Sequence, residues 1–370
     1  MLPHVNTAAH VAVLGLGRLG TAIAERLAET HRVRTWSRSH AGATTAARAV
    51  TGADVVLLCV YDAAACRDVI EECGSALAPG CTVVNTATVG PDEAVALAQL
   101  AAEHGAGYVH APVVGSVPAA LAGELTILTG AATDESVAEV LGRLGRRIRL
   151  AGPGDAAAAK LLANSVLGDA LLSLRRSLRH ADQLDLPRAA ALDVLESTVL
   201  APVVRAKRRA LEQPGGRAAV GAQFTAAALR KDLALLTRAT GSAAPAARDL
   251  EILMATGAVR ADDDVAAVAT AGLGLGADLT AALDAARLDL AAGVVMTPGV
   301  ARPLVAYALG HATGDPAHFR EAFLPTAHVE GHRDGSFTSW GLDEYAALFP
   351  GHPSADEAGR RRRLETVDVS

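Results

Sequence analysis

The chain has 370 residues, a formal net charge of −6 and a hydrophobic fraction of 51%. This length exceeds one domain of about 100–200 residues, so we expect at least two domains. The acidic balance gives no reason to expect nucleic acid, and no run of about 18 consecutive apolar residues predicts a membrane helix. Residues 1–7 lack the basic and apolar regions of a secretory signal, so we expect a cytoplasmic location.

Short apolar strands alternate with helix-period segments up to about Leu150, which predicts a parallel sheet with helices on both faces. The predicted strands are 11–14, 33–36, 55–60, 82–85, 108–110, 126–129 and 148–150. The four cysteines are Cys59, Cys66, Cys73 and Cys81. They form no C-x-x-C pair, so we expect buried reduced thiols and no metal site.

The first strand ends in a glycine-rich turn. Gly15 permits the tight turn, Gly17 lets the backbone approach a pyrophosphate, and Gly20 lets helix and strand pack closely. Free N–H groups at the start of the helix then face the phosphates. This pattern predicts a dinucleotide-binding turn, with a purely structural glycine turn as the alternative. The residues of the predicted turn are Gly15, Leu16, Gly17, Arg18, Leu19 and Gly20.

The end of the second strand bears on the choice of cofactor. An acidic residue there would bind the adenosine ribose of NAD, but the segment Trp36-Ser-Arg-Ser39 has none. Arg38 can form charge-assisted hydrogen bonds to the 2′-phosphate of NADP, and Ser37 and Ser39 can add neutral ones. We therefore expect NADP(H), with NAD(H) less favoured. The alternative is that Arg38 is only a solvated loop charge.

The rest of the chain reads as helices followed by a region of different composition. A long helix is predicted over 155–184, and shorter ones over 187–196, 202–211, 224–239, 244–256 and 262–269. The predicted fold is α/β, with a doubly wound Rossmann sheet over 1–152 and an all-helical second domain over 153–271. A linker or helix over 272–298 then leads to a small α+β extension over 299–370.

Lys160 and Asn164 lie four residues apart, hence on one face of the long helix. They interrupt an apolar stripe where the sheet domain and the helical domain should meet. Polar groups at such a place are costly unless they are used or paired. The alternative is a lysine that only extends its ammonium group to water.

Over 9–269 the chain resembles the β-hydroxyacid dehydrogenase family, which includes 3-hydroxyisobutyrate dehydrogenases and the related imine reductases. The resemblance rests on the glycine turn, Val55–Asp62, Asn85-Thr-Ala-Thr88, His110–Pro118 with Gly123–Leu125, the Gly-x-Gly-x5-Lys-x3-Asn motif ending at Asn164, and Phe224 with Lys231-Asp232-Leu233.

The resemblance implies a role for each matching residue. Lys160 would be the general acid that protonates a carbonyl oxygen as hydride arrives, because hydride addition leaves an alkoxide that needs stabilisation. Asn164 would position the substrate, and Lys231 would line the cleft with Asp232 as its neighbour. Further cofactor contacts are expected at Val60, Tyr61, Thr88 and Lys231.

The substrate loop departs from the family pattern Asp-Ala-Pro-Val-Ser-Gly. His110 replaces the acid and Val114 replaces the serine that helps to hold a substrate carboxylate. Ser116 and the amides of Gly115 and Ser116 remain beside Val114 for substrate binding. We expect a substrate that depends less on a carboxylate or is held differently, and we expect His110 to be structural.

Three functions remain open. The favoured one is an NADP-dependent oxidoreductase acting on a small carbonyl or alcohol, with a homodimer formed through the helical domain. Imine reduction is the alternative, because Trp36-Ser-Arg-Ser39 is similar to the second-strand end of imine reductases; these typically have Asp or Tyr instead of a catalytic lysine. A non-catalytic NADP-binding scaffold is the third.

The last region resembles the opening half of a nuclear transport factor 2-like cone, similar to small lumazine-binding modules. Asp334-Gly335 is a hairpin signal between two alternating segments. His328 and His332 are expected to be surface or pocket histidines and not metal ligands. The basic run 360–363 is expected to be solvated.

Overall fold

A computed structural model of the chain describes residues 9–40, 45–130, 132–212, 222–242, 244–255, 258–271, 287–290, 298–324, 326–333, 336–349, 351–354, 357, 360 and 362–364. The chain forms two compact units. The first comprises Met1–Leu172, Val220–Glu251 and Asp262–Val265, and the second comprises Ser173–Ala219, Ile252–Ala261 and Ala266–Ser370. The predicted domain boundaries stay a prediction. Of the linker or helix predicted over 272–298, only residues 287–290 and 298 are among the described residues.

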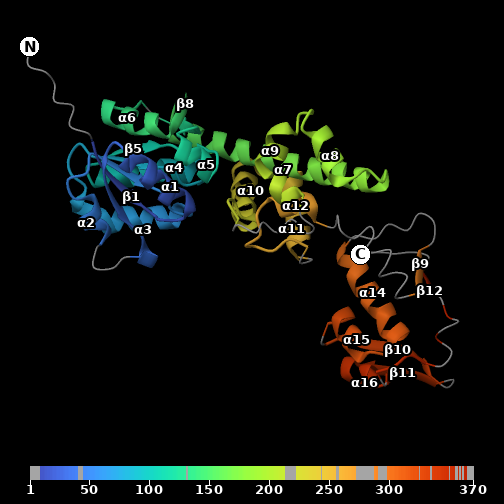
Figure 1. Cartoon of the computed structure of the whole chain (residues 1–370). Coiled ribbons are helices and arrows are strands. Elements are labelled where there is room, and N and C mark those ends of the chain that lie inside the picture. The colour runs from blue at the N-terminus through green and yellow to red at the C-terminus, as the bar shows by residue number, and fades with distance from the viewer. Residues whose placement is uncertain are drawn as a thin grey trace, which may run out of the picture. The chain divides into compact units, whose positions relative to one another are not determined.

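A five-stranded parallel sheet forms the centre of the first unit (Figure 1). Its order is β2-β1-β3-β4-β5, and every neighbouring pair is parallel. The strands are β1 His10–Leu14, β2 Arg32–Trp36, β3 Val55–Leu58, β4 Thr82–Asn85 and β5 Gly107–His110. The predicted parallel sheet is thus confirmed for these five strands. β3 and β4 are buried along their whole length, as expected for strands covered on both faces.

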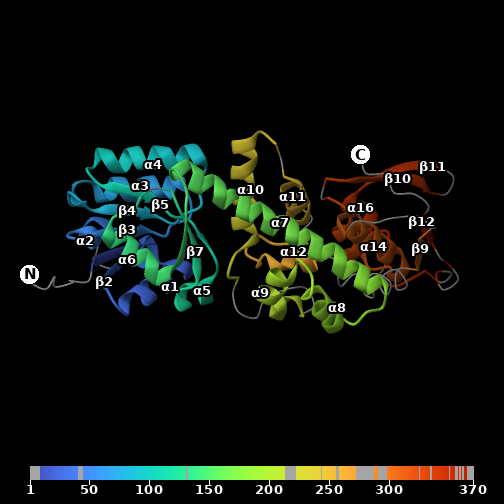
Figure 2. The same cartoon turned by 90° about the horizontal axis from the view of Figure 1, so that it is seen from above.

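Helices cover both faces of this sheet (Figure 2). One face packs against α2 Ala46–Val50, α3 Ala63–Cys73 and α4 Pro91–Glu103. The other packs against α1 Arg18–Ala28, α5 Val117–Ala122 and α6 Glu135–Leu144. The 3-10 turns η1 Arg38–His40 and η2 Gly74–Ala76 complete this part. Each face of the sheet therefore has its own close-packed core, and the two cores hold the strands in fixed positions.

A separate three-stranded sheet corrects one expectation. Its strands are β6 Val113–Val114, β7 Leu125–Thr129 and β8 Gly145–Arg149. The last two predicted strands belong to this sheet and not to the five-stranded one. β6 pairs antiparallel with β7. A strand of two residues shows no alternation, so periodicity could not reveal β6.

The long helix α7 spans Pro153–Gln183, close to its predicted range, and passes from the first unit into the second. The other helices of the region are α8 Arg188–Leu195, α9 Ala201–Leu211, α10 Ala226–Thr240, α11 Pro245–Ala255 and α12 Ala266–Thr270. Among the described residues α7 alone has the length and hydropathy of a membrane-spanning helix. This is weak evidence, because the core helix of a soluble protein meets the same test. The absence of a membrane span stays a prediction.

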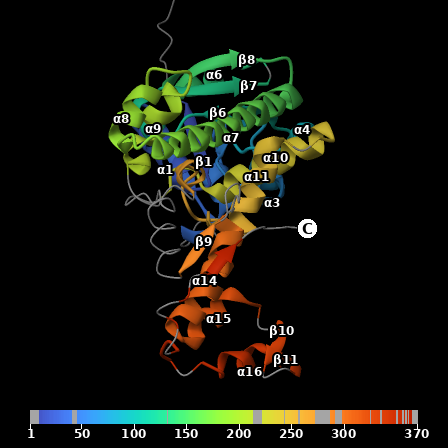
Figure 3. The same cartoon turned by 90° about the vertical axis from the view of Figure 1, so that its right-hand side faces the viewer.

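The C-terminal elements, most of which are labelled in Figure 3, pack around an aromatic core of their own. They are β9 Leu288–Leu290, α14 Pro298–Thr313, α15 Pro316–Ala322, β10 His328–Arg333, β11 Ser336–Gly341, α16 Leu342–Ala346 and β12 Arg362–Leu364. Phe319 is fully buried among Tyr307, Tyr345 and Phe349. β10 and β11 pair antiparallel as predicted, while Asp334 and Gly335 lie outside the described residues.

Candidate functional site

The glycine turn lies between β1 and α1, and its three glycines differ in what surrounds them. Gly15 has φ +104°, and a Cβ there would lie 2.5 Å from the Cys59 carbonyl oxygen. A Cβ on Gly20 would collide with the Gly15 carbonyl oxygen. A Cβ on Gly17 would meet no atom within 4 Å. Gly15 and Gly20 are therefore required by packing, whereas the space beside Gly17 suits a ligand that approaches the backbone.

The segment after β2 places the three residues expected at the ribose. Ser37 is buried, while Arg38 and Ser39 are exposed at the start of η1. The hydroxyls of Ser37 and Ser39 lie 3.5 Å apart. An exposed arginine with a hydroxyl residue on each side of it in the sequence suits a phosphate group.

A chain of hydrogen bonds joins the predicted catalytic residues within the first unit. The Lys160 ammonium donates to Asn164 Oδ1 over 3.0 Å, and Asn164 Nδ2 donates to Asp232 Oδ2 over 2.5 Å. Asp232 Oδ1 lies 2.7 Å from Lys231 Nζ, which also donates to the Thr88 carbonyl oxygen over 2.8 Å. Residues from two helices and one loop thus form one connected polar site.

Local structure explains why these side chains meet. Lys160 and Asn164 share one face of α7 because they are four residues apart. The start of α10 is anchored by Thr225, whose hydroxyl accepts from Ala228 N. Asp264 Oδ2 accepts from Gln223 N just before that helix. These anchors position Lys231 and Asp232 one to two turns into α10.

Burial shifts the pKa values of two side chains in this hydrogen-bonded chain, Lys160 and Asp232. Removal of the Lys160 ammonium from water lowers its pKa to about 8, although Asp232 opposes the shift. Burial likewise raises the pKa of Asp232, against the opposing effect of Lys231. Lys231 already contacts a carboxylate and a carbonyl, so Lys160 is the cation with a proton that can be given away. This arrangement can act as a general acid near neutral pH.

A second buried network supports the loop that carries Thr88. Asn85 Oδ1 accepts from Ala87 N over 2.9 Å, and Asn85 Nδ2 donates to the Tyr108 hydroxyl over 3.0 Å. That hydroxyl lies 3.3 Å from His110 Nδ1. Cys66 Sγ donates to Asn85 Oδ1. No role for Asn85 was predicted from the sequence, although its place in the Asn-Thr-Ala-Thr motif marked it.

His110 and the cysteines lie in the interior. His110 is fully buried, and burial lowers its pKa to about 3, so its ring is neutral at ordinary pH. All four cysteines are free thiols, and burial raises the pKa of each; Cys59 reaches about 11. The expected burial is confirmed for Cys66, Cys73 and Cys81, whereas Cys59 is half-buried. The described residues contain no cluster of three potential metal ligands.

The loop that is expected to bind the substrate follows β5. Val114 is 39% exposed, and Ser116 caps α5 without using its hydroxyl for the cap. Among the described residues, no hydrogen bond joins Val114, Gly115 or Ser116 to the Lys160 chain. Tyr61, in the loop after β3, is half-exposed, and Lys231 Nζ lies 5.2 Å from the centre of its ring. The loop therefore presents an apolar side chain where the family pattern has the serine that helps to hold a substrate carboxylate, and the Ser116 hydroxyl takes no part in the helix cap.

Known proteins resemble this chain in several ways. Residues 10–152 match the NAD binding domain of 6-phosphogluconate dehydrogenase, and residues 297–370 match a family described as putative lumazine-binding. A 3-hydroxyisobutyrate dehydrogenase of Mycobacterium tuberculosis, solved with L-serine, is 26% identical with a TM-score of 0.58. That match covers 70% of this chain and 98% of the other. Residues 10–152 thus match an NAD-binding domain, and the fold is similar to that of this 3-hydroxyisobutyrate dehydrogenase.

Two curated relatives differ in their names. A 2-(hydroxymethyl)glutarate dehydrogenase of Eubacterium barkeri is 38% identical over 107 residues, covering 28% of this chain and 36% of the relative. A cytokine-like nuclear factor N-PAC of Xenopus tropicalis is 28% identical over 220 residues, covering 54% and 41%. The chain thus spans about two fifths of the length of these relatives. What this chain itself matches over residues 10–152 is an NAD-binding domain.

Proposed function

We propose that this protein is an NADP-dependent oxidoreductase that transfers hydride between NADPH and a small carbonyl or alcohol substrate. One observation carries the proposal: Lys160, whose pKa is lowered to about 8, begins a hydrogen-bonded chain through Asn164 to Asp232. A carbonyl oxygen needs a proton donor as hydride reaches its carbon. The nicotinamide ring of bound NADPH would supply that hydride.

The residues of the site divide the work. Lys160 is mostly protonated near pH 7 and gives its proton to the developing alkoxide, which leaves a neutral amine. Asn164 holds the ammonium group in place and orients the substrate. Lys231 lines the site with its charge balanced by Asp232. For the oxidation of an alcohol the same proton returns to Lys160.

The remaining site residues stay proposals on the same basis. Gly17 and its neighbours in the glycine turn receive the pyrophosphate. Val60, Tyr61 and Thr88 contact the cofactor from the loops after β3 and β4. Val114, Gly115 and Ser116 contact the substrate, which the loop favours as a molecule less dependent on a carboxylate.

The preference for NADPH over NADH rests on Arg38. The guanidinium is exposed at the end of β2, and residues 36–40 include no acid that would bind the ribose of NAD. We expect Arg38→Ala to weaken NADPH binding while NADH binding changes little. Equal affinity of the unaltered protein for the two cofactors would contradict this preference.

Two other functions lead to different outcomes in one assay. Imine reduction is favoured by the Trp36-Ser-Arg-Ser39 segment, and a non-catalytic scaffold agrees with a relative named as a nuclear factor. NADPH consumption is measured with small aldehydes, keto acids and cyclic imines. We expect consumption with aldehydes or keto acids. Consumption with imines alone assigns imine reduction, and NADPH binding without any consumption assigns the scaffold.

The assembly and the C-terminal region extend the proposal. We expect a homodimer formed through the helical domain, which sedimentation analysis of the full chain can test. Residues 299–370 are proposed as part of a nuclear transport factor 2-like module, supported by the match of 297–370 to the putative lumazine-binding family. A cytoplasmic location is proposed on the sequence alone.

A further inference from the structure

Strand β2 leaves one edge of the five-stranded sheet open. It is the first strand in the order and pairs with β1 alone. Gly15 N donates to the Trp36 carbonyl oxygen, so the peptide groups of Trp36, and by alternation those of Arg34, face β1. The peptide groups of Val33 and Thr35 therefore face outward. Within the described part of the chain no hydrogen bond reaches those outward groups.

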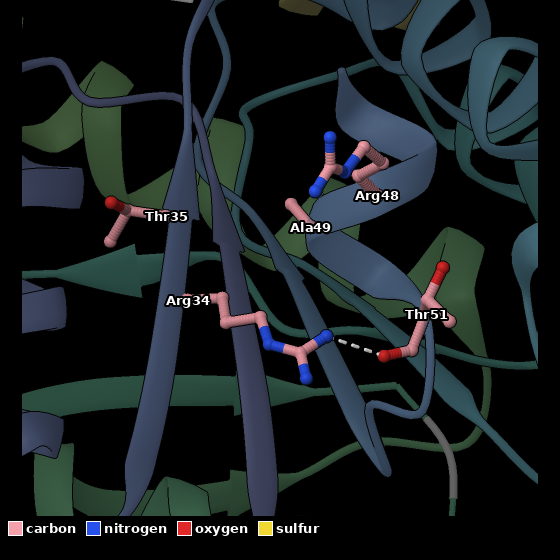
Figure 4. A pocket seen from close by; sticks show the side chains of 5 residues that line it. All are labelled: Arg34, Thr35, Arg48, Ala49 and Thr51. Carbon is pink, nitrogen blue, oxygen red and sulfur yellow. Dashed lines mark hydrogen bonds between the residues drawn. The ribbon is translucent and has the colours of Figure 1, made fainter. Parts of the chain in front are cut away.

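A basic cavity lies beside this edge on the side of α2. It has a volume of about 640 Å³ and is lined by Arg34, Thr35, Arg48, Ala49 and Thr51 (Figure 4). Arg34 comes from β2 and uses one nitrogen to donate to the Thr51 carbonyl oxygen over 2.6 Å. Arg48 comes from α2, and within the described ranges it has no acidic partner. Two guanidinium groups thus border one open cavity.

The basic surface continues towards the start of β2. A neighbouring hollow of about 360 Å³ is lined in part by Arg32, Arg34, Ala49 and Gly52. Arg32 and Arg34 are both exposed and lie two residues apart, on the same face of the strand. The α2 side of the edge is therefore positively charged along most of its length.

The other face of the same strand has a different character. Val33 and Thr35 point to the side of α1, where Figure 4 shows Thr35 directed away from Arg34. A hollow of about 310 Å³ there is lined by small or apolar side chains that include Ala24, Ala28 and Val33, with one acid, Glu25. The edge therefore offers a basic hollow on one face and a small, mostly apolar one on the other.

These features select an occupant. An added strand would satisfy the outward peptide groups of Val33 and Thr35, and its side chains would enter the two faces alternately. A second copy of this strand fits poorly, because antiparallel pairing about Arg34 would set arginine against arginine, and like charges placed opposite each other are destabilising. An acidic strand supplies the missing charge.

We propose that the β2 edge binds an extended acidic segment of a partner protein by strand addition, with carboxylates facing Arg34 and Arg48 and small apolar side chains facing the hollow beside α1. The segment alternates acidic and small apolar residues over about five positions, matching the length of β2. This interaction does not depend on the proposed oxidoreductase activity, because Arg34, Arg48 and the outward peptide groups of β2 are not assigned to that site; the hollow beside α1 shares Leu16 with the glycine turn.

Binding of labelled peptides to the full chain tests the proposal. The probe is acetyl-Glu-Val-Glu-Val-Glu-amide, compared with Glu-Glu-Glu-Val-Val and Lys-Val-Lys-Val-Lys. We expect saturable binding of the first, at least tenfold weaker binding of the second, and none of the third. N-methylation of both valines in the probe should abolish binding, because it removes the peptide N–H groups that would donate to β2 and leaves the protein unaltered.

Protein variants locate the site. Arg48→Glu should weaken binding of the probe at least tenfold, whereas Arg67→Glu on the exposed side of α3 should not. Thr35→Pro removes an outward N–H and should have the effect of N-methylation; thermal unfolding checks that the variant folds. Equal binding of the scrambled peptide, tolerance of N-methylation, or unchanged affinity of Arg48→Glu overturns strand addition. Full displacement by inorganic phosphate or NADP+ makes the cavity a small-anion or cofactor site and also overturns it.

Discussion

At the scale of single residues, His110 shows how a departure from a family motif is accommodated. The substitution of a histidine for an acid leaves a neutral ring against the Tyr108 hydroxyl in a fully buried position. The two rings are stacked at 6.3 Å between their centres. The histidine therefore belongs to the support of the loop that carries Thr88 and lies outside the Lys160 chain.

This burial predicts a pH dependence of stability. The unfolded His110 takes up a proton as pH falls below 6.5, whereas the folded one resists protonation until about pH 3. The free energy of unfolding therefore falls by up to about 1.4 kcal/mol for each unit by which the pH is lowered between 6.5 and about 3. Denaturant unfolding at several pH values measures how the free energy of unfolding changes with pH. This pH dependence should be weaker for His110→Gln than for His180→Gln, which replaces an exposed histidine. Equal slopes would refute the buried neutral ring.

Asp232 sets the orientation of Asn164. An ionised carboxylate only accepts hydrogen bonds, so it selects the Nδ2 end of the amide and leaves Oδ1 for Lys160. Asp232→Asn removes that selection, because an amide can donate as well as accept. We expect turnover to fall by roughly 10²-fold, the effect of a misplaced catalytic group. Glu251→Gln, which alters an exposed ion pair with Arg230, should leave turnover unchanged. A fully active Asp232→Asn enzyme would remove Asp232 from the site.

At the scale of elements, the glycines of the β1–α1 turn have two different roles: Gly20 is required by packing, and Gly17 is expected to admit the cofactor. Gly17→Ala should leave thermal unfolding almost unchanged, since the new methyl group meets open space, but should weaken NADPH binding. Gly20→Ala should destabilise the fold by about 1–3 kcal/mol, because its methyl group would collide with the Gly15 carbonyl. Unfolding without cofactor and fluorescence titration with NADPH measure the two effects. If Gly17→Ala binds NADPH normally, the pyrophosphate does not lie there.

Elements with a regular apolar periodicity could be predicted from the sequence. Features that depend on contacts between residues far apart in the chain could not. The five parallel strands and α7 follow from apolar periodicity, and Lys160 and Asn164 follow from helical spacing. β6 is too short to show a period. The bond from Asn164 to Asp232 joins residues 68 positions apart, which no local pattern encodes. The open edge at β2 likewise depends on strand order, which alternation alone does not determine.

At the scale of the whole molecule, the chain combines cores that differ in composition. The sheet of the first unit is packed with aliphatic side chains, whereas the C-terminal elements pack around aromatic rings. His311 lies within this aromatic cluster and shares a hydrogen bond of 3.1 Å with the Tyr345 hydroxyl. Glu357 and Arg362 form a mostly buried ion pair in the same region. The C-terminal elements therefore have a core that can unfold as a cooperative unit.

The aromatic core predicts a selective loss of stability. Phe319→Ala should destabilise the C-terminal elements by about 3–5 kcal/mol, because the ring is fully buried. Phe337→Ala offers a matched control, since that ring is 62% exposed. Near-ultraviolet circular dichroism during unfolding should show an earlier aromatic transition for Phe319→Ala alone, with NADPH binding retained. Simultaneous loss of NADPH binding would contradict an independent core.

The central claim is that Lys160 gives the proton in an NADPH-dependent reduction. The most direct test is the pH dependence of the single-turnover rate of NADPH oxidation. The substrate is the aldehyde or keto acid that supports NADPH consumption in the assay described above. We predict that the rate of the unaltered protein falls as pH rises through about 8, as Lys160 loses its proton. Lys160→Ala should be slower by roughly 10²–10⁴-fold and should lose that inflection, while Lys207→Ala keeps both rate and profile. A Lys160→Ala protein with normal rate and the same inflection would contradict the account.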